Sequence, residues 1–114
     1  SNSIPKVVMN EKNELIYISR SLIPGSKKKL TKYNKQVCIY AFNKEELNLF
    51  INFKRKSKIE YLEDIEILRF YEFNKKILMV KTSGNSIAVD YPSDIKKVEK
   101  KLIKNDKKIR NKSK

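Results

Sequence analysis

The apolar residues of this chain fall into short segments, and the spacing within them alternates between that of β-strands and that of α-helices. Residues 6–10 and 15–19, on either side of the polar turn 11–13, predict a β-hairpin. Residues 36–42 are almost continuously apolar, which is typical of a strand covered on both faces. We therefore expect the hairpin to be followed by a central, buried strand.

Helical spacing occupies much of the chain that follows. Asn43 can cap a first helix and Pro92 can occupy the first turn of the last one, with a second helix expected over 61–73 and short strands at 77–80 and 87–89. Strands that alternate with helices predict an α/β layered sheet with helices on its faces. The positions expected to be buried on the three helices are Leu47, Phe50, Ile51, Tyr61, Leu62, Ile65, Leu68, Ile95, Val98 and Leu102.

A chain of 114 residues has room for one small domain. We assign residues 1–104 to it and expect 105–114 to be a basic, flexible tail, because Ile109 is the one apolar residue there. The formal net charge is +14, and residues 96–114 contribute more than half of the excess. This uneven distribution disfavours nucleic acid as the main partner. A small basic nucleic-acid-binding module remains the alternative to an enzyme.

The composition excludes several kinds of chemistry. Without histidine and with Cys38 as the one cysteine, the chain lacks the parts of an internal disulfide, a Cys–His catalytic pair or a zinc site. General acid–base catalysis would have to use carboxylates, lysine, tyrosine or a carboxylate-bound metal. The sequence also shows no apolar run of about eighteen residues and no secretion leader. We expect a cytoplasmic protein without a membrane span.

Carboxylates lie at two places where they could do chemistry. Asp90 follows a short apolar segment and precedes a helix start, at the sheet edge where ligands of α/β folds bind. It could hold Mg²⁺ or merely cap the helix. Glu60, Glu63 and Asp64 stand three or four residues apart on one expected helix, where they could bind a hydroxyl-rich ligand or form a solvated face. From the residues alone, both interpretations of each group stay open.

Three other polar side chains are candidates for a binding site. Arg20 closes the hairpin with a planar guanidinium that suits a carboxylate or phosphate, although an ordinary surface arginine explains it too. Gln36 and Tyr40 lie four residues apart on the expected central strand and therefore on one face of it. Polar groups buried there would either line a pocket or bond to the backbone.

Five stretches of the sequence, taken in order, resemble the C-terminal half of the CMP-Kdo synthetases, the 3-deoxy-manno-octulosonate cytidylyltransferases. They are KVV at 6–8, LIYISRSLIP at 15–24, IYAF at 39–42, KIEYLE at 58–63 and IAVDYPSDI at 87–95. The resemblance implies a Rossmann-like nucleotidyltransferase fold with a mixed sheet and a β-hairpin that serves dimerisation. It also implies a homodimeric enzyme that joins CTP and a 2-keto sugar acid to give the CMP-sugar and pyrophosphate.

The same resemblance implies roles for individual residues. Asp90 matches the family's Mg²⁺-binding aspartate, Arg20 matches an arginine that contacts the sugar acid, and Tyr40 and Glu63 fall on sugar-site positions. Such an enzyme would serve the synthesis of lipopolysaccharide or another cell-surface polysaccharide.

The sequence also departs from the family. Gln36 stands where the family has histidine and Asp64 where it has glutamine, so both are assigned to the substrate site and leave the exact sugar open, Kdo or a relative. Nothing here corresponds to the family's phosphate-gripping loop or cytosine pocket. We expect the 114-residue fragment to be inactive by itself.

Overall fold

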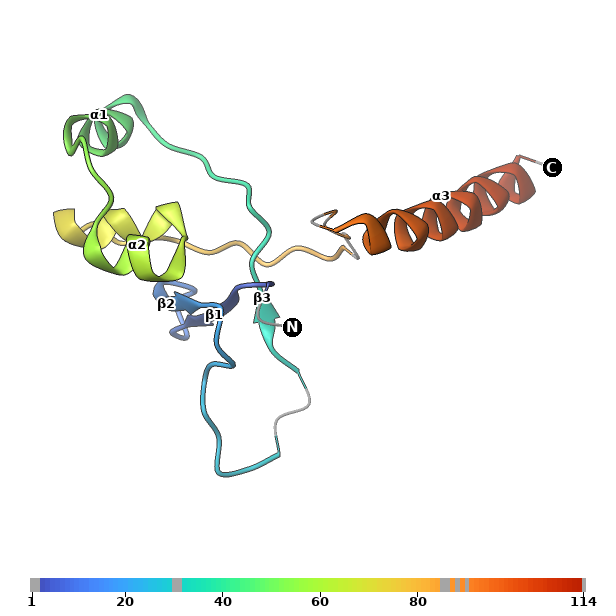
Figure 1. Cartoon of the computed structure of the whole chain (residues 1–114), viewed down its shortest axis with the longest axis horizontal. Helices are drawn as coiled ribbons and strands as arrows, with labels where there is room; N and C mark the ends of the chain where they lie inside the picture. Colours follow the sequence, from blue (N-terminus) through green and yellow to red (C-terminus); the bar gives the residue numbers. More distant parts are fainter. Residues whose placement is uncertain (1–2, 30–31, 85–86, 88, 90, 114) are drawn as a thin grey trace. The chain divides into compact units, whose positions relative to one another are not determined.

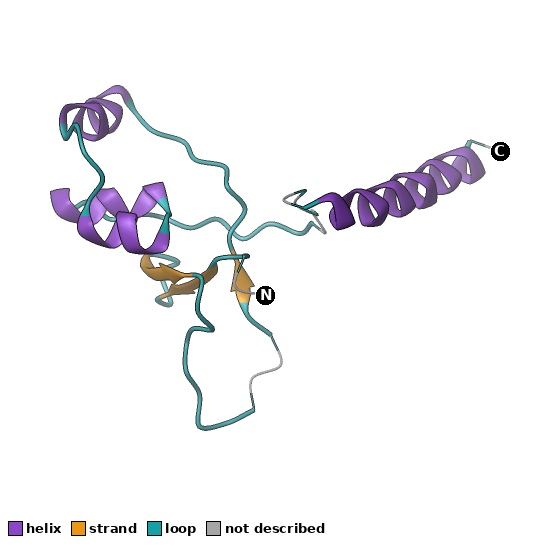
Figure 2. Ribbon diagram, in the orientation of Figure 1, coloured by secondary structure: helices purple, strands orange, loops and turns teal. Residues whose placement is uncertain are grey.

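The computed structural model describes residues 3–29, 32–84, 87, 89 and 91–113 (Figure 1). The chain forms two compact units, Ser1–Val80 and Lys81–Lys114, and each is described by itself. Among the described residues, the first unit contains the strands and three helical segments, and the second contains one long helix (Figure 2).

A small antiparallel sheet opens the first unit. β1 (Lys6–Met9) pairs with β2 (Leu15–Ser19), and β3 (Asn34–Lys35) pairs with the other edge of β1, which gives the order β2-β1-β3. The turn between β1 and β2 is fixed by Asn10, whose side-chain oxygen accepts hydrogen bonds of 2.9 Å from the backbone N–H groups of Lys12 and Glu14. The predicted hairpin is confirmed.

Each of the next two helices begins at a polar cap. Asn43 caps α1 (Lys44–Asn52), as predicted, and Ser57 caps α2 (Lys58–Glu63). In both, the glutamate at the third helical position accepts a hydrogen bond from the backbone N–H of the cap. α2 ends at Asp64, and a 3₁₀-helix, η1 (Glu66–Phe73), follows. The single helix predicted over 61–73 is wrong, because Asp64 adopts the left-handed conformation, with φ of 53°, and ends the helical pattern.

The core of the first unit joins the hairpin to η1 and to the residue before it. Its members all lie below one-tenth exposure, and α2 and η1 lie alongside β1 and β2 (Figure 1). The buried apolar residues are Val7, Leu15, Ile18, Ile65, Ile67, Leu68 and Phe70. Of the helix positions predicted to be buried, Ile65 and Leu68 are confirmed. Leu47, Ile51, Tyr61 and Leu62 are exposed, so those predictions were wrong.

The predicted central strand at 36–42 is not formed. Beyond β3, the backbone N–H of Gln36 donates to the carbonyl of Pro5 at 3.0 Å, and the N–H of Ile39 turns back to the carbonyl of Val37 at 2.7 Å. The side chains that were predicted to be covered on both faces are exposed, and Ile39 reaches 82% exposure. A strand needs neighbours for its backbone groups, and the described part of the chain supplies none here.

Two further predicted strands are also absent from the described residues. The segment 77–80 contributes one isolated bridge, between Leu78 and Glu14, and Ile87 and Val89 lie in no strand, while Ala88 lies outside the described residues. The fold is therefore mixed α/β with a small antiparallel sheet, and the pairings seen do not make the mixed, layered sheet that was predicted.

The second unit contains α3 (Pro92–Lys112), which starts at Pro92 as predicted. The sequence predicted that 105–114 would be a flexible tail, but the helix continues to Lys112, with its surface exposed to solvent throughout the last turns. Ile95 and Leu102, predicted to be buried, are exposed within this unit. Across the described residues, no helix has both the length and the apolar character needed to cross a membrane.

Candidate functional site

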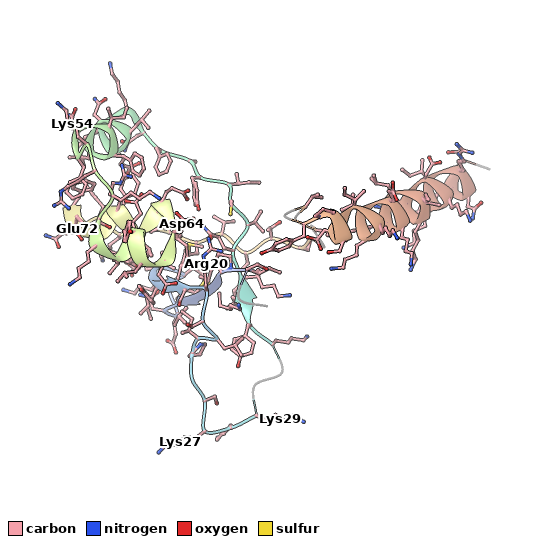
Figure 3. All side chains as sticks on the ribbon, in the orientation of Figure 1. Arg20, Lys27, Lys29, Lys54, Asp64 and Glu72 are labelled. Carbon is pink, nitrogen blue, oxygen red and sulfur yellow. The ribbon has the colours of Figure 1, made fainter. Side chains whose placement is uncertain are left out.

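The candidate site is built where β2 ends and α2 ends. Arg20, half-buried, follows β2, and its guanidinium reaches three backbone carbonyls: Nε donates to Glu63 at 2.7 Å, Nη1 to Ser3 at 3.1 Å and Nη2 to Asp64 at 3.1 Å. The last carbonyls of a helix lack N–H donors of their own and carry partial negative charge, so a cation is stabilised there. Figure 3 shows Arg20 below Asp64 at this junction. The Arg20 guanidinium is thus oriented by uncharged backbone carbonyl oxygens.

Glu63 holds the other half of this corner. One carboxylate oxygen accepts hydrogen bonds from Ser19 Oγ at 2.6 Å and Tyr17 OH at 3.2 Å, and the other accepts from the backbone N–H of Arg20 at 3.0 Å. Burial raises the pKa of Glu63, but these hydrogen bonds and the Arg20 charge outweigh it, so the pKa lies below its usual value of 4.5. Glu63 is therefore ionised at neutral pH and ties α2 to β2.

Asp64 lies at the same corner, where its backbone carbonyl and its side-chain carboxylate have different partners. Its carbonyl binds Arg20, whereas its exposed carboxylate forms an ion pair of 2.9 Å with Lys56. The hydrogen bond and the charge of Lys56 lower the pKa of the Asp64 carboxyl. Because Lys56 offsets the Asp64 charge, an anionic ligand at Arg20 meets less repulsion from Asp64 than the sequence suggests.

Gln36 and Tyr40 form a second group. The Gln36 amide donates to the Tyr40 hydroxyl, and the Tyr40 ring lines an apolar cavity of about 190 Å³. Burial, with the nearby Cys38 and Glu66, raises the pKa of Tyr40 to about 12, so its phenol stays protonated at neutral pH. The remaining walls come from Phe42, Leu47, Phe50, Glu66, Ile67 and Phe70.

The structure therefore brings together some of the predicted site residues. Arg20, Glu63 and Asp64 converge, and Gln36 contacts Tyr40, but no hydrogen bond or ion pair between described residues joins the two groups. Asp90, the predicted Mg²⁺ ligand, lies outside the described residues. Among the residues that are described, no group of three or more acidic or cysteine side chains is placed so that it could hold a metal ion.

Sequence reasoning missed the two hydroxyl groups that hold Glu63. Tyr17 and Ser19 are two residues apart on β2 and therefore share a face of the strand. That spacing was visible in the sequence, but their acceptor lies more than forty residues further along the chain, which a local pattern does not reveal. The solvated acidic face is wrong for Glu60 and Glu63, whose carboxylates are held by Arg69 and Ser19. Asp64 does lie on an exposed face, where it pairs with Lys56.

Lowering the pH should weaken the Glu63 link. The pKa of Glu63 is lower in the folded protein than in the unfolded chain, so its contribution to stability is present above about pH 4.5 and is lost as the pH falls through the folded-state pKa. We expect Glu63→Gln to be less stable than wild type at pH 7 and the difference in stability to narrow as the pH is lowered below 4.5. Urea unfolding at pH 7 and at pH 3 measures this. A gap between wild type and variant that is equally wide at pH 3 would contradict it.

Comparisons with known proteins show which proteins the chain is similar to. No family model matches the chain. The 3-deoxy-manno-octulosonate cytidylyltransferase of Flavobacterium johnsoniae is 36% identical over 99 residues, which is 85% of this chain and 40% of the relative. The enzyme of the same name from Chlamydia pneumoniae is 37% identical over 94 residues, or 82% of this chain and 37% of the relative.

A solved structure agrees with the sequence relatives. It is CMP:2-keto-3-deoxy-manno-octonic acid synthetase in complex with CTP, which matches 92% of this chain with a TM-score of 0.80 and 28% identity and is itself covered over 44% of its length. The chain is homologous to the CMP-Kdo synthetases. It spans about two fifths of the length of the curated relatives that it matches. Relation to the CMP-Kdo synthetases was the prediction of the sequence, and it is confirmed.

Proposed function

We propose that this chain is part of a cytidylyltransferase that transfers CMP from CTP to a 2-keto sugar acid, Kdo or a relative, and releases pyrophosphate. The proposal is supported by homology to the CMP-Kdo synthetases, one of which was solved with CTP. In this reaction a sugar hydroxyl attacks the α-phosphorus of CTP. The new O–P bond forms, the bond to the pyrophosphate oxygen breaks, and the hydroxyl loses its proton.

One observation supports the assignment of the sugar acid to this chain: among the described residues, the Arg20 guanidinium donates hydrogen bonds to three backbone carbonyls and to no carboxylate. A guanidinium has five N–H donors, and the described residues accept from three of them, which leaves one donor on each terminal nitrogen. Two donors are the number that a carboxylate accepts in a bidentate pair. Glu63 and Asp64 would then face the hydroxyl groups of the sugar, and Tyr40 and Gln36 would offer a phenol and an amide.

We assign Asp90 as the Mg²⁺ ligand on its match to the family motif. Mg²⁺ takes one or two carboxylates and fills its other positions with water and substrate phosphates, so a lone aspartate from this chain suits its chemistry. Bound Mg²⁺ would neutralise charge on the phosphates of CTP. We extend the same proposal to a cytoplasmic homodimer that uses the β1–β2 hairpin and serves polysaccharide or lipopolysaccharide synthesis.

The alternative function, a basic nucleic-acid-binding module, is favoured by one observation, the excess of lysine along α3. Such binding would weaken steeply with salt. Homology to a cytidylyltransferase over most of the chain favours the enzyme.

Direct binding of the sugar acid tests the proposed function. We expect Kdo to shift the NMR signals of the amides around Arg20 and Glu63 in the 114-residue chain, and the methyl ester of Kdo to shift them at least tenfold more weakly, because the ester cannot accept a charge-assisted pair. Equal binding of acid and ester, or shifts confined to other residues, would contradict the assignment.

The chain alone should not catalyse the reaction. It spans about two fifths of the relatives, so we expect no release of pyrophosphate from CTP and Kdo in the presence of Mg²⁺. A coupled pyrophosphate assay measures this, with a full-length relative such as the Flavobacterium johnsoniae enzyme as the positive control. Turnover by the 114-residue chain would show that the part of the relatives outside the match is not needed for the reaction.

A further inference from the structure

The lysines of α3 gather on one side of the helix. Five of them recur at every fourth residue, and three more fall beside these. At 3.6 residues per turn, all eight lie within roughly 160° of the helix circumference. We call this surface the lysine face, and it consists of Lys96, Lys97, Lys100, Lys101, Lys104, Lys107, Lys108 and Lys112. Lys101 is half-buried and the other seven are exposed.

The protein itself neutralises little of the charge on the lysine face. Lys97 pairs with Asp94 at 2.9 Å, and no ion pair between described residues engages the other seven lysines. Like charges three or four residues apart on a helix repel one another and destabilise it. The lysine face is therefore a surface of uncompensated positive charge, and an anionic partner would remove this repulsion.

The rest of the α3 surface is of a different kind. Ile95, Val98, Leu102 and Ile109 recur three, four and seven residues apart, which places them on the side opposite the lysine face. The acidic side chains of Glu99 and Asp106 also lie outside the lysine face, and Asp106 pairs with Arg110 at 3.1 Å. The lysines can therefore meet an anionic surface without bringing these carboxylates against it.

This distribution of charge favours a flat anionic surface over a nucleic acid. The major groove of DNA is about 12 Å wide and a helix with its side chains measures about 10–12 Å across, so a helix in the groove has phosphates on both sides. Glu99 and Asp106 would then face phosphate and be repelled. Single strands are bound largely by stacking on aromatic rings, and α3 contains no aromatic residue. A membrane surface meets one side of a helix only, and its anionic headgroups attract lysines without requiring a fixed geometry.

We propose that the lysine face of α3 binds the surface of a membrane that contains anionic lipids, with α3 parallel to that surface and the ammonium groups at the lipid phosphates. Each lysine near such a surface strengthens binding about fivefold. Attachment of this kind is peripheral and reversible and needs no membrane-spanning helix. The proposal concerns where the protein is held and not the reaction, so it stands apart from the roles assigned to Arg20 and Asp90.

Co-sedimentation with lipid vesicles tests the proposal. The 114-residue chain is mixed with phosphatidylcholine vesicles in which about one lipid in three is phosphatidylglycerol, and with vesicles of phosphatidylcholine alone. We expect the chain to bind the anionic vesicles at least 30-fold more tightly than the neutral ones. Raising the salt from about 0.1 M to about 1 M shortens the Debye length from about 10 Å to about 3 Å and should release the chain. Neither measurement involves CTP or Kdo, so the result does not depend on the proposed function.

Triple variants make the test specific for α3. Changing Lys100, Lys104 and Lys108 together to glutamine should weaken binding to the anionic vesicles about 100-fold, because three lysines are lost. Glutamine forms helices about as well as lysine, so α3 is retained, and circular dichroism checks this. The matched control changes the three exposed lysines of 27–29 to glutamine, which removes the same charge elsewhere in the chain and should weaken binding less than tenfold. Changing Lys100, Lys104 and Lys108 to arginine keeps the charge and should leave binding as in wild type.

Three results would overturn the proposal. The first is binding to neutral vesicles that equals binding to anionic ones. The second is an equal loss of binding in the α3 glutamine variant and in the variant of 27–29, which would make net charge, and not the lysine face, responsible. The third is tighter binding to a DNA or RNA oligonucleotide than to the anionic vesicles at the same salt concentration, which would make a nucleic acid the partner of α3.

Discussion

Replacing Glu60 by glutamine is expected to lower the free energy of unfolding by about 3 kcal/mol. The Glu60 side chain is 1% exposed, and both of its oxygens accept from Arg69, at 2.6 and 2.7 Å. Burial raises the pKa of Glu60, but the hydrogen bonds and charge of Arg69, with the backbone N–H of Ser57, outweigh it and lower the pKa. Removing the negative charge leaves the Arg69 guanidinium, 13% exposed, without a counter-ion.

The loss should be large because this pair joins three helices. Arg69 lies on η1 and Glu60 on α2, and the guanidinium also lies 3.9 Å from the centre of the Phe50 ring on α1 and donates to the Phe50 carbonyl at 3.4 Å. Glu60 further closes the capping box of α2 through the backbone N–H of Ser57. One substitution therefore loosens the contacts between all three helical segments.

Urea unfolding followed by circular dichroism measures this loss. The matched control is Glu45→Gln, because Glu45 forms an exposed ion pair with Lys75 at 3.9 Å and surface pairs contribute little. We expect the control to change stability by less than about 0.5 kcal/mol. If Glu60→Gln were as mild as Glu45→Gln, the buried pair would not be the link between the helices.

The parts of the fold that the sequence predicted are those set by local chemistry. The hairpin follows from alternating residues on either side of a turn held by Asn10, and the start of α1 follows from Asn43. Each needs partners within a few residues, which a pattern in the sequence contains. The break at Asp64 was missed because a non-glycine residue in the left-handed conformation leaves no compositional signal.

The central strand failed for the opposite reason. The apolar run at 36–42 indicates side chains that are suited to burial. Burial and strand pairing also need other segments of polypeptide as neighbours, and a local pattern does not show whether these are present. The described residues supply the cavity beside Phe42 and no neighbouring strand. The sequence thus predicted the apolar character of the segment but not its exposed surroundings.

For the candidate site, too, the sequence predicted individual residues but not the long-range contacts between them. From the residues alone, Glu63 and Asp64 were selected as one acidic group and Arg20 was selected separately. The structure places the three in one corner because Arg20 satisfies the free carbonyls at the end of α2. Glu63 adds the side-chain link to β2 through Ser19. Long-range pairing of this kind follows from tertiary structure alone.

Arg20 also gives the prediction with the largest expected effect on ligand binding. Arg20→Lys keeps the positive charge but replaces a fork of five donors by a compact ammonium, which cannot hold three carbonyls and a bidentate carboxylate together. We expect the dissociation constant for Kdo to rise about 10- to 100-fold, as for the loss of a charge-assisted pair of hydrogen bonds worth about 1.5–3 kcal/mol. NMR titration of the 114-residue chain measures it.

The control for Arg20→Lys is Arg110→Lys, at an exposed arginine of α3 that pairs with Asp106 at 3.1 Å, and we expect it to leave Kdo binding unchanged. A purely structural Arg20 would predict another outcome: lower stability, with the remaining folded protein still binding Kdo as tightly as wild type. Urea unfolding of the same sample separates the two, since binding is compared where both proteins are folded. Should Arg20→Lys fail to fold, the comparison of Kdo with its methyl ester on the wild-type chain decides the same question. If Arg20 binds the carboxylate of Kdo, the chain must bind the acid more tightly than the ester. If Arg20 only caps α2, the chain need not distinguish the acid from the ester.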